Sequence, residues 1–225
     1  MIVTAHDLHR TYGTGEAVVH ALDGVDVNID ERRFVAVMGP SGSGKSTLMH
    51  VLAGLDRPTS GTVAIAGTEV TKLDDKALTE LRRDKVGFIF QAFNLLPILT
   101  AEENILLPLS LAGRTPDKEW VDKLIDAVGL RDRLDHRPSE LSGGQQQRVA
   151  VARALASRPA VIFADEPTGN LDSVSSREVL ELLRRAVDEF GQTVVMVTHD
   201  PDAAKSADEV IEMADGKIVN GRPAA

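Results

Sequence analysis

The sequence predicts an α/β fold built on a mainly parallel sheet. Short apolar runs at residues 34–38, 86–90, 161–164 and 193–197 are separated by segments with helical periodicity. Continuous apolar strands that alternate with helices are typical of a parallel sheet covered on both faces. A glycine-rich loop follows the first run, and polar side chains follow two of the others. These positions place a ligand site at the carboxyl ends of the strands.

The chain is expected to begin with strands. Polar and apolar residues alternate at 25–29, which predicts a half-buried strand, and residues 62–66 predict another that ends in a turn at Gly67. Helical spacing recurs in four segments, at 48–53, 74–84, about 144–157 and about 175–190. The alternation of strands and helices predicts right-handed crossover connections in the parallel part.

A further helical region extends from residue 100 to residue 130. Thr100 is a suitable N-cap, and Glu103 stands three residues later as its capping-box partner. Gly113 and Pro116 divide the region, so two helices are expected here.

The composition is that of an ordinary globular protein. The 225 residues are 43% hydrophobic with a mean hydropathy of −0.08, and the absence of repeats and linkers predicts one domain over 1–225. No window approaches the roughly 18 consecutive apolar residues of a membrane span, and the N-terminus lacks a signal pattern, so a cytoplasmic chain is expected. The chain has no cysteine, which excludes disulfides, and its net charge of −9 argues against a nucleic-acid partner.

Residues 39–47 fit the nucleotide-triphosphate loop G-x-x-x-x-G-K-[ST]. Glycines let successive backbone N–H groups point at phosphate oxygens, and the helix that follows offers its positive N-terminus. Lys45 is expected to reach the β- and γ-phosphates, and the Ser46 hydroxyl to bind the bridging Mg²⁺. The alternative, a turn without a ligand, does not explain a lysine followed by two hydroxyl residues. The expected nucleotide-binding residues of this loop are Ser41, Gly42, Ser43, Gly44, Lys45, Ser46 and Thr47.

The apolar run at 161–164 ends in two carboxylates, Asp165 and Glu166. Carboxylates beside a core are costly unless they have a partner, and a magnesium–nucleotide site supplies one. Asp165 is expected to orient the metal, and Glu166 to polarise an attacking water. A solvated strand end that opens a turn is the alternative.

A second glycine-rich segment leads into the helix at about 144–157. Its residues Ser142, Gly143, Gly144 and Gln145 combine a hydroxyl with a helix N-terminus, which is suited to a second anion site. The alternative is a serine N-cap with glycines at a helix start.

Five motifs in order give the chain its resemblance to a known family. The phosphate loop, the LSGGQ segment, the VIFADE strand, Asn170-Leu171-Asp172 and Thr198-His199-Asp200 resemble the nucleotide-binding subunit of an ATP-binding-cassette (ABC) transporter over nearly the whole chain. The resemblance implies an α/β P-loop NTPase core with a mainly parallel sheet. It also implies an antiparallel β subdomain on the N-terminal side and an α-helical subdomain, approximately 92–157, that carries the LSGGQ signature.

The same resemblance implies roles for four further residues. Tyr12 resembles the aromatic residue that stacks on adenine, and Asp172 the aspartate that communicates across a dimer. Gln91 resembles the glutamine that contacts Mg²⁺ and senses the transmembrane partner, and His199 the switch histidine that holds the γ-phosphate. Gln91 and His199 thereby join Glu166 in the catalytic set. The alternatives are a core aromatic for Tyr12 and capped strand ends for Gln91 and His199.

The family assignment also implies partners. Two copies would dock head to tail around two Mg²⁺–ATP, so that the signature of one copy closes over the phosphate loop of the other. An integral membrane permease would hold the dimer at the cytoplasmic face of the membrane. Residues 88–97 and 164–173 are similar to the subgroup of macrolide exporters and lipoprotein-release systems. The transported molecule, the direction of transport and the permease stay open.

The competing hypothesis is a soluble ABC-type ATPase that acts on DNA or ribosomes. Such relatives carry a coiled-coil insertion or two cassettes in one chain, whereas about 95 residues separate Ser46 from Leu141 here. One departure from the family pattern is the segment 30–33, where relatives usually have a Gly-Glu turn before the strand.

An apolar run follows Gln91. Phe93, Leu95, Leu96 and Leu99 are expected either to line a groove for a short permease helix or to pack locally under the helices of 100–130.

Overall fold

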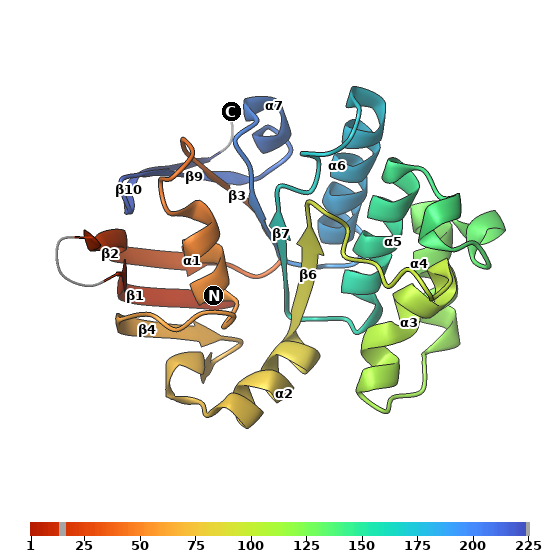
Figure 1. The fold of residues 1–225 in the computed structure, drawn as a ribbon, viewed down its shortest axis with the longest axis horizontal. Helices are drawn as coiled ribbons and strands as arrows, with labels where there is room; N and C mark the ends of the chain where they lie inside the picture. Colours follow the sequence, from red (N-terminus) through yellow and green to blue (C-terminus); the bar gives the residue numbers. More distant parts are fainter. Residues whose placement is uncertain (14–16, 224–225) are drawn as a thin grey trace.

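The computed structural model describes residues 1–13 and 17–223, whose strands form a four-stranded and a six-stranded sheet (Figure 1). The smaller, antiparallel sheet has the order β2-β1-β4-β5 and consists of β1 (Val3–Tyr12), β2 (Val19–Ile29), β4 (Ser60–Ile65) and β5 (Thr68–Glu69). The larger sheet has the order β10-β9-β3-β8-β7-β6. Its strands are β3 (Phe34–Met38), β6 (Val86–Phe90), β7 (Val161–Asp165), β8 (Val194–Val197), β9 (Glu209–Ala214) and β10 (Lys217–Pro223).

The larger sheet is parallel except at one edge, where β10 pairs antiparallel to β9. The helices are α1 (Lys45–Leu52), α2 (Asp75–Lys85), α3 (Ala101–Leu111), α4 (Lys118–Val128), α5 (Gly143–Ala156), α6 (Ser173–Asp188) and α7 (Pro201–Ala204). Short 3₁₀ turns lie at Val70–Lys72, Arg131–Arg133 and Pro138–Glu140. In the described residues no helix is both long enough and apolar enough to cross a membrane.

The two faces of the larger sheet are buried in separate hydrophobic cores. Along β3, Phe34 and Ala36 contact one core, whereas Val35 and Val37 contact the other. Successive side chains of a strand point to opposite faces, so a strand with two buried faces must be apolar at every position. This explains the uninterrupted apolar runs of β3, β7 and β8.

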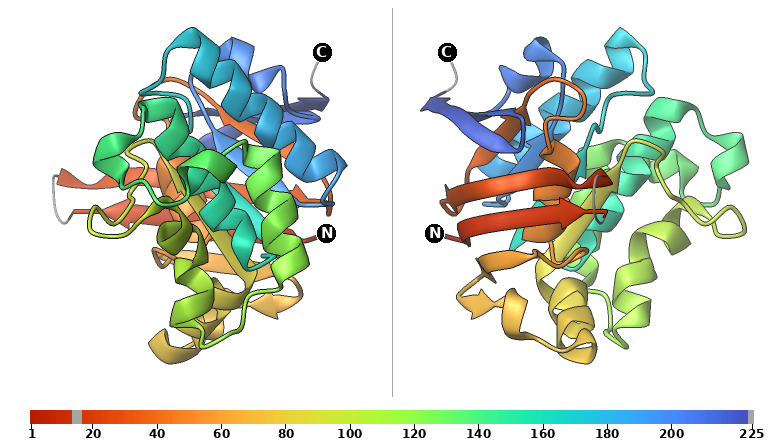
Figure 2. Two further views of the ribbon diagram at one scale, coloured as in Figure 1. Left: turned by 90° about the vertical axis from the view of Figure 1, so that its right-hand side faces the viewer. Right: turned by 60° about the vertical axis from the view of Figure 1, so that its left-hand side comes forward.

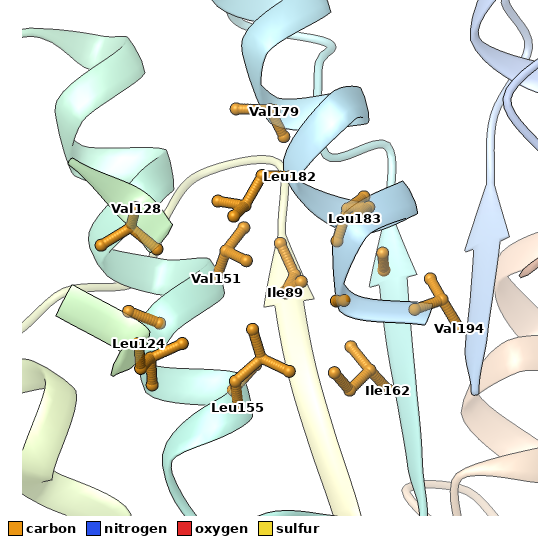
Figure 3. Packing of buried hydrophobic residues seen from close by; sticks show 14 of the residues in the cluster. Ile89, Leu124, Val128, Val151, Leu155, Ile162, Val179, Leu182, Leu183 and Val194 are labelled. Atoms are coloured by element: carbon orange, nitrogen blue, oxygen red, sulfur yellow. The ribbon is translucent and has the colours of Figure 1, made fainter. Parts of the chain in front are cut away.

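The first core lies between the larger sheet and helices α3 to α6. Figure 3 shows Ile89 of β6 and Ile162 of β7 packed beneath Leu155 of α5 and Leu183 of α6. The second core joins the other face of the sheet to α1 and the smaller sheet. Helix α1 therefore lies between the two sheets, while α3, α4 and α5 gather on the far side (Figures 1 and 2).

The predicted fold class is confirmed, including the antiparallel sheet near the N-terminus. The capping box of Thr100 and Glu103 is present in both directions, and the region splits into α3 and α4 as expected. Helix α1 begins at Lys45, three residues earlier than predicted, because Gly44 is its N-cap. The single domain over 1–225 and the helical subdomain at 92–157 stay predictions.

Sequence patterns missed β1, β9 and β10. In β1, the pairing with β2 shifts register between Ala5 and Leu8, and Asp7 has a φ of 48°. Such a bulge interrupts the alternation of side chains, so the strand carries no continuous period of two. The same irregular ladder explains why β2 begins at Val19 and not near residue 25.

Candidate functional site

The phosphate loop joins β3 to α1 and is folded around its own lysine. Nζ of Lys45 donates hydrogen bonds of 2.8 Å to the carbonyl oxygens of Gly39 and Pro40. Gly44 has a φ of 99°, and a Cβ there would lie 2.3 Å from the carbonyl oxygen of Ala21. Only glycine fits this combination of backbone conformation and close approach. The backbone conformation of the loop is thus set by its own residues.

A cavity of about 740 Å³ opens over this loop. The side chains of Lys45, Glu166 and His199 meet in it, although they come from α1 and from the ends of β7 and β8. The predicted loop residues Ser41, Gly42, Gly44, Lys45, Ser46 and Thr47 all line it. Ser43 is buried, and its Oγ has no hydrogen-bond partner among the residues that the structure describes.

Ser46 and Asp165 form a small oxygen-rich pair at the floor of the site. The Ser46 hydroxyl donates to Oδ1 of Asp165 at 3.5 Å. Burial raises the pKa of Asp165, and the charges of His50 and Lys45 oppose this only in part. A partly buried carboxylate beside a hydroxyl fits Mg²⁺, which prefers oxygen ligands and usually needs only one or two protein groups besides phosphates. No cluster of three His, Cys, Asp or Glu side chains suitable for a metal occurs in the described part of the chain.

Glu166 stands in an unusual backbone conformation next to His199. Its φ is 44°, a region that costs a non-glycine residue about 1–3 kcal/mol and that persists only where the surroundings enforce it. Oε1 of Glu166 lies 3.0 Å from Nδ1 of His199, and its backbone N–H donates to Val197 at 2.9 Å. The strained turn aims a carboxylate into the cavity and links it to an imidazole.

Gln91 is held by the loop that follows Glu166. Nε2 of Gln91 donates to Oδ1 of Asn170 at 3.2 Å, and Nδ2 of Asn170 donates back to the carbonyl oxygen of Gln91 at 3.0 Å. Gln91 is not among the residues that line the cavity. Its contact with Mg²⁺ therefore stays a prediction.

The second glycine-rich segment lies at the start of α5 and outside the cavity lining. Ser142 and Gln145 form a reciprocal capping box, with bonds of 3.3 Å and 2.8 Å. The predicted residues Gly143 and Gly144 occupy the first turn of the helix. The local structure is thus the serine N-cap of the alternative interpretation, and the structure does not bring this segment onto the chain's own phosphate loop cavity.

Asp172 caps α6. Its carboxylate accepts bonds of 3.0 Å from the backbone N–H groups of Val174 and Ser175 and a bond of 2.7 Å from the Ser175 hydroxyl. The backbone bond from Ser175 is the first of several contacts that lower the pKa of Asp172. This exposed turn lies beside the start of α5. The two are so close that a Cβ added at Gly144 would lie 2.6 Å from Oγ of Ser175.

Tyr12 lies at the surface and not in the core, since 40% of it is exposed. The core alternative for Tyr12 is therefore wrong. Its hydroxyl donates to Asp56 at 2.7 Å, and the Arg10 guanidinium lies 4.4 Å from the ring centre. Tyr12 pairs in the β1–β2 ladder with Val19, which lines the cavity, but Tyr12 does not line it. Stacking on adenine stays a prediction.

An apolar groove of about 410 Å³ lies between α2, β6, α3 and α5. Phe88, Leu107 and Leu111 are among its lining residues. None of the residues Phe93, Leu95, Leu96 and Leu99 lines this groove, although Asn94 does, so their contact with a permease helix stays a prediction. Leu95 instead packs against the first core, since the chain turns sharply after Gln91, with φ of 61° at Phe93 and 51° at Asn94.

The prediction missed residues that approach the site from other segments. Val19, His20, Ala21, Asp215 and Gly216 also line the cavity. They lie on β2 and in the β9–β10 turn, whose boundaries the sequence patterns did not reveal. His50 does not line the cavity, but its charge acts to lower the pKa of Asp165. Its position could have been predicted, because it stands four residues after Ser46 and so on the same face of α1.

Comparisons with known proteins agree with this geometry. A family model described as ABC transporter matches residues 22–169. An ABC transporter ATP-binding protein of Thermotoga maritima is 51% identical over 215 residues, which are 94% of this chain and 91% of that protein. The macrolide export ATP-binding/permease protein MacB of Marinobacter nauticus is 49% identical over 220 residues, which are 97% of this chain. The chain spans 34% of that MacB, so about a third of its length.

Solved structures show the same fold. A dimeric post-hydrolysis state of the ATP-binding cassette MJ0796, bound to ADP and Pi, superposes with a TM-score of 0.89 at 43% identity and covers 100% of this chain and 99% of that one. The ABC transporter ATP-binding protein MJ0796 of Methanocaldococcus jannaschii is 46% identical to this chain over 224 residues. These are 96% of this chain and 95% of that protein.

Proposed function

The chain belongs to the ABC transporter family, and from this premise we propose that it hydrolyses ATP as one half of a head-to-tail homodimer docked on a membrane permease. It is an ABC transporter ATP-binding subunit with ATPase activity. The relatives reported above are described as transporter proteins or ATP-binding cassettes. We therefore set aside the alternative of an ATPase that acts on DNA or ribosomes.

The observation that carries the catalytic proposal is the meeting of Lys45, Glu166 and His199 in one cavity. Lys45 would exchange the carbonyl oxygens of Gly39 and Pro40 for phosphate oxygens, which are stronger acceptors because they are charged. Glu166 would accept the proton of the attacking water, and His199, 3.0 Å away, would hold Glu166 and the γ-phosphate in register.

Ser46 and Asp165 are the residues proposed to hold Mg²⁺, with Gln91 added if its bond to Asn170 opens. The ion, when bound, neutralises charge on the β- and γ-phosphates. Tyr12 would stack on the adenine from the β1 side of the cavity. The nucleotide would thereby be contacted by both sheets.

The dimer proposal rests on a missing half of the site. Ser142, Gly143, Gly144 and Gln145 form a helix start with Ser142 exposed, and it lines no part of the chain's own cavity, although such a start is suited to phosphate. Two solved structures of one relative, the ATP-binding cassette MJ0796, are described as dimeric. We propose that this segment and Asp172 close over the nucleotide of a second copy.

The permease proposal rests on the groove lined by Phe88, Leu107 and Leu111. Leu111 is 73% exposed at the rim of this groove, so apolar surface is available for a short helix. The MacB relatives combine an ATP-binding part with a permease in one protein. We propose an integral membrane permease as the partner of this chain, a location at the cytoplasmic face of the membrane, and export or lipoprotein release as the transport class.

The variant Glu166→Gln tests the catalytic proposal. Loss of the general base should reduce ATP turnover by roughly 10²- to 10⁴-fold while ATP binding persists. The variant should also accumulate as an ATP-bound dimer, which size-exclusion chromatography with and without ATP detects. Native turnover in this variant would remove Glu166 from its assigned role.

A further inference from the structure

Gln147 is a fully buried polar side chain beside the turn that holds Glu166, and the proposed mechanism does not use it. It lies in the second turn of α5 and is 0% exposed. Its Nε2 donates to the carbonyl oxygen of Pro167 at 2.5 Å and to that of Phe90 at 3.3 Å. One amide group therefore joins α5 to the end of β6 and to the turn after β7.

Each of the two acceptors adjoins a residue of the proposed site. Phe90 directly precedes Gln91, and Pro167 directly follows Glu166. The same two segments are joined a second time by the reciprocal bonds of Gln91 and Asn170. Gln147 thus closes a three-way junction between the LSGGQ helix, the Gln91 segment and the Glu166 turn.

The Glu166 turn requires such support. Its φ of 44° is sparsely populated, so the conformation must be enforced by bonds around it. Two of these are backbone bonds, from Glu166 to Val197 and from Gly169 to the carbonyl oxygen of Glu166 at 3.0 Å. The bond from Gln147 holds the next peptide group and comes from a different element, so a displacement of α5 would reach the turn directly.

The amide nitrogen of Gln147 makes the bonds to Pro167 and Phe90, while its amide oxygen, Oε1, is left without a bond among the described residues. A buried unpaired acceptor is unfavourable, and each such group in a native structure calls for an explanation. The carbonyl oxygen of Phe90 also accepts from the backbone N–H of Phe93 at 3.2 Å, so the Pro167 carbonyl is the acceptor that depends more on Gln147. A side-chain amide that can donate to both oxygens explains why a glutamine is found here.

We propose that Gln147 is a positioning residue for ATP hydrolysis, which sets the orientation of Glu166 through the Pro167 carbonyl according to the position of α5. The inference rests on the proposed role of Glu166. A small error in the position of a catalytic group can reduce a rate about 10²-fold, so the effect should fall on turnover and not on nucleotide binding.

The main test uses Gln147→Met, which keeps an unbranched side chain of similar length and removes both donors. We expect kcat to fall roughly 10- to 100-fold, with a KM for ATP and a melting temperature close to those of the native chain. Gln192→Met is the matched control, because Gln192 is 8% exposed and does not line the nucleotide cavity, and its Oε1 likewise has no partner among the described residues. Its kcat should equal the native value.

A second variant tests the donor role itself. Gln147→Glu has nearly the same shape, but its carboxylate repels both carbonyl oxygens, whereas its protonated form can donate to one of them. Its kcat relative to the native chain should therefore rise as the pH falls. A ratio that does not change with pH would contradict the proposal.

The outcomes separate this inference from the proposed function. Native kcat in Gln147→Met together with an inactive Glu166→Gln would overturn only the positioning role. Native turnover in Glu166→Gln would overturn the mechanism on which that role depends. A fall in kcat that is matched by Gln192→Met, or that accompanies a large loss of melting temperature, would assign Gln147 a structural role only.

Discussion

At the scale of single residues, the site combines side chains whose folded environment is unfavourable without a ligand. Glu166 has a strained backbone, and Asp165 is a partly buried carboxylate with a raised pKa. Both features oppose folding. Glu166 lines the nucleotide cavity, and Asp165 accepts a hydrogen bond from Ser46, which also lines it. Stability is often reduced at functional sites in this way, because the interactions that offset the cost come from the ligand.

The pKa of Asp165 leads to a prediction about stability. Because burial raises this pKa, the folded chain holds the proton more tightly than the unfolded chain, whose aspartates titrate near about 3.9. The unfolded state then binds fewer protons between the two pKa values, so stability falls as the pH rises through that interval. Asp165→Asn should lack this fall and should unfold at a higher denaturant concentration than the native chain at pH 7 without nucleotide.

With Mg²⁺ and ATP, the order of the two proteins should reverse. The variant should bind Mg²⁺–ATP roughly 10- to 100-fold more weakly, in line with the loss of a group that orients a metal. Asp202→Asn is the control, because the bond from Lys205 lowers the pKa of Asp202 and its neutralisation should not stabilise the chain. A native denaturation midpoint for Asp165→Asn without nucleotide would contradict the prediction.

Sequence motifs predicted the residues that carry chemistry better than the residues that position them. Lys45, Glu166 and His199 were predicted and do meet in one cavity. Gln147 was not predicted, and Asn170 was recognised only as part of a motif without a role, because a side-chain amide that bonds backbone carbonyls leaves no spacing pattern in a sequence. Such partners depend on which loops the fold brings together.

At the scale of elements, α5 contacts more of the site than any motif indicated. Its first turn is the LSGGQ segment, Gln147 holds the Glu166 turn, and Arg153 near its end donates to the carbonyl oxygens of Phe93 and Asn94 at 2.9 Å and 2.5 Å. Both acceptors belong to residues with positive φ, so the arginine stabilises the turn that follows Gln91. Helix α5 therefore connects the groove, which Arg153 lines, to the catalytic turn.

The groove beside α3 gives a prediction at this scale. Leu111→Glu places a charge on its apolar rim and should abolish co-purification with a multi-span membrane protein from detergent-solubilised membranes. ATP binding should stay native, since Leu111 does not line the nucleotide cavity. Val219→Glu is the matched control, because Val219 is 61% exposed and lies on β10, away from the groove. Unchanged co-purification of Leu111→Glu would argue against the groove as the permease site.

The elements themselves were predicted where two buried faces or a cap left a clear signal. Strands β3, β7 and β8 are apolar throughout, and α3 begins at the predicted capping box. The groove beside α3 was not predicted with its own lining residues, because positive φ values at Phe93 and Asn94 redirect the chain after Gln91. Asn94 is of a residue type that tolerates positive φ, but Phe93 is not, so the sequence signals this turn only weakly.

At the scale of the whole molecule, the proposed dimer can be tested by mixing two inactive variants. Lys45→Ala removes the phosphate-loop lysine, and Ser142→Arg blocks the segment expected to close over a partner's nucleotide. In a head-to-tail dimer of one variant with the other, both defects fall on one nucleotide and the second site is intact. Random pairing should restore up to about a quarter of native ATP turnover.

Each variant alone should be inactive, because every site of its homodimer carries one defect. Melting temperatures near the native value would show that both variants fold. If the mixture is as inactive as its components, the two motifs do not act across an interface. A site completed within one chain would give that result.

The position of α1 between the two sheets also identifies the stationary part of the molecule. Leu48, Met49, Val51 and Leu52 are all buried in the core that joins the sheets, so the helix behind the phosphate loop is anchored along one face, while Ser46 and Thr47 face the cavity. A rearrangement on nucleotide binding is then expected in the helices that pack on the other core, α3 to α6. The loop that binds the phosphates would then keep its position, and the displacement of those helices relative to it would depend on the nucleotide state.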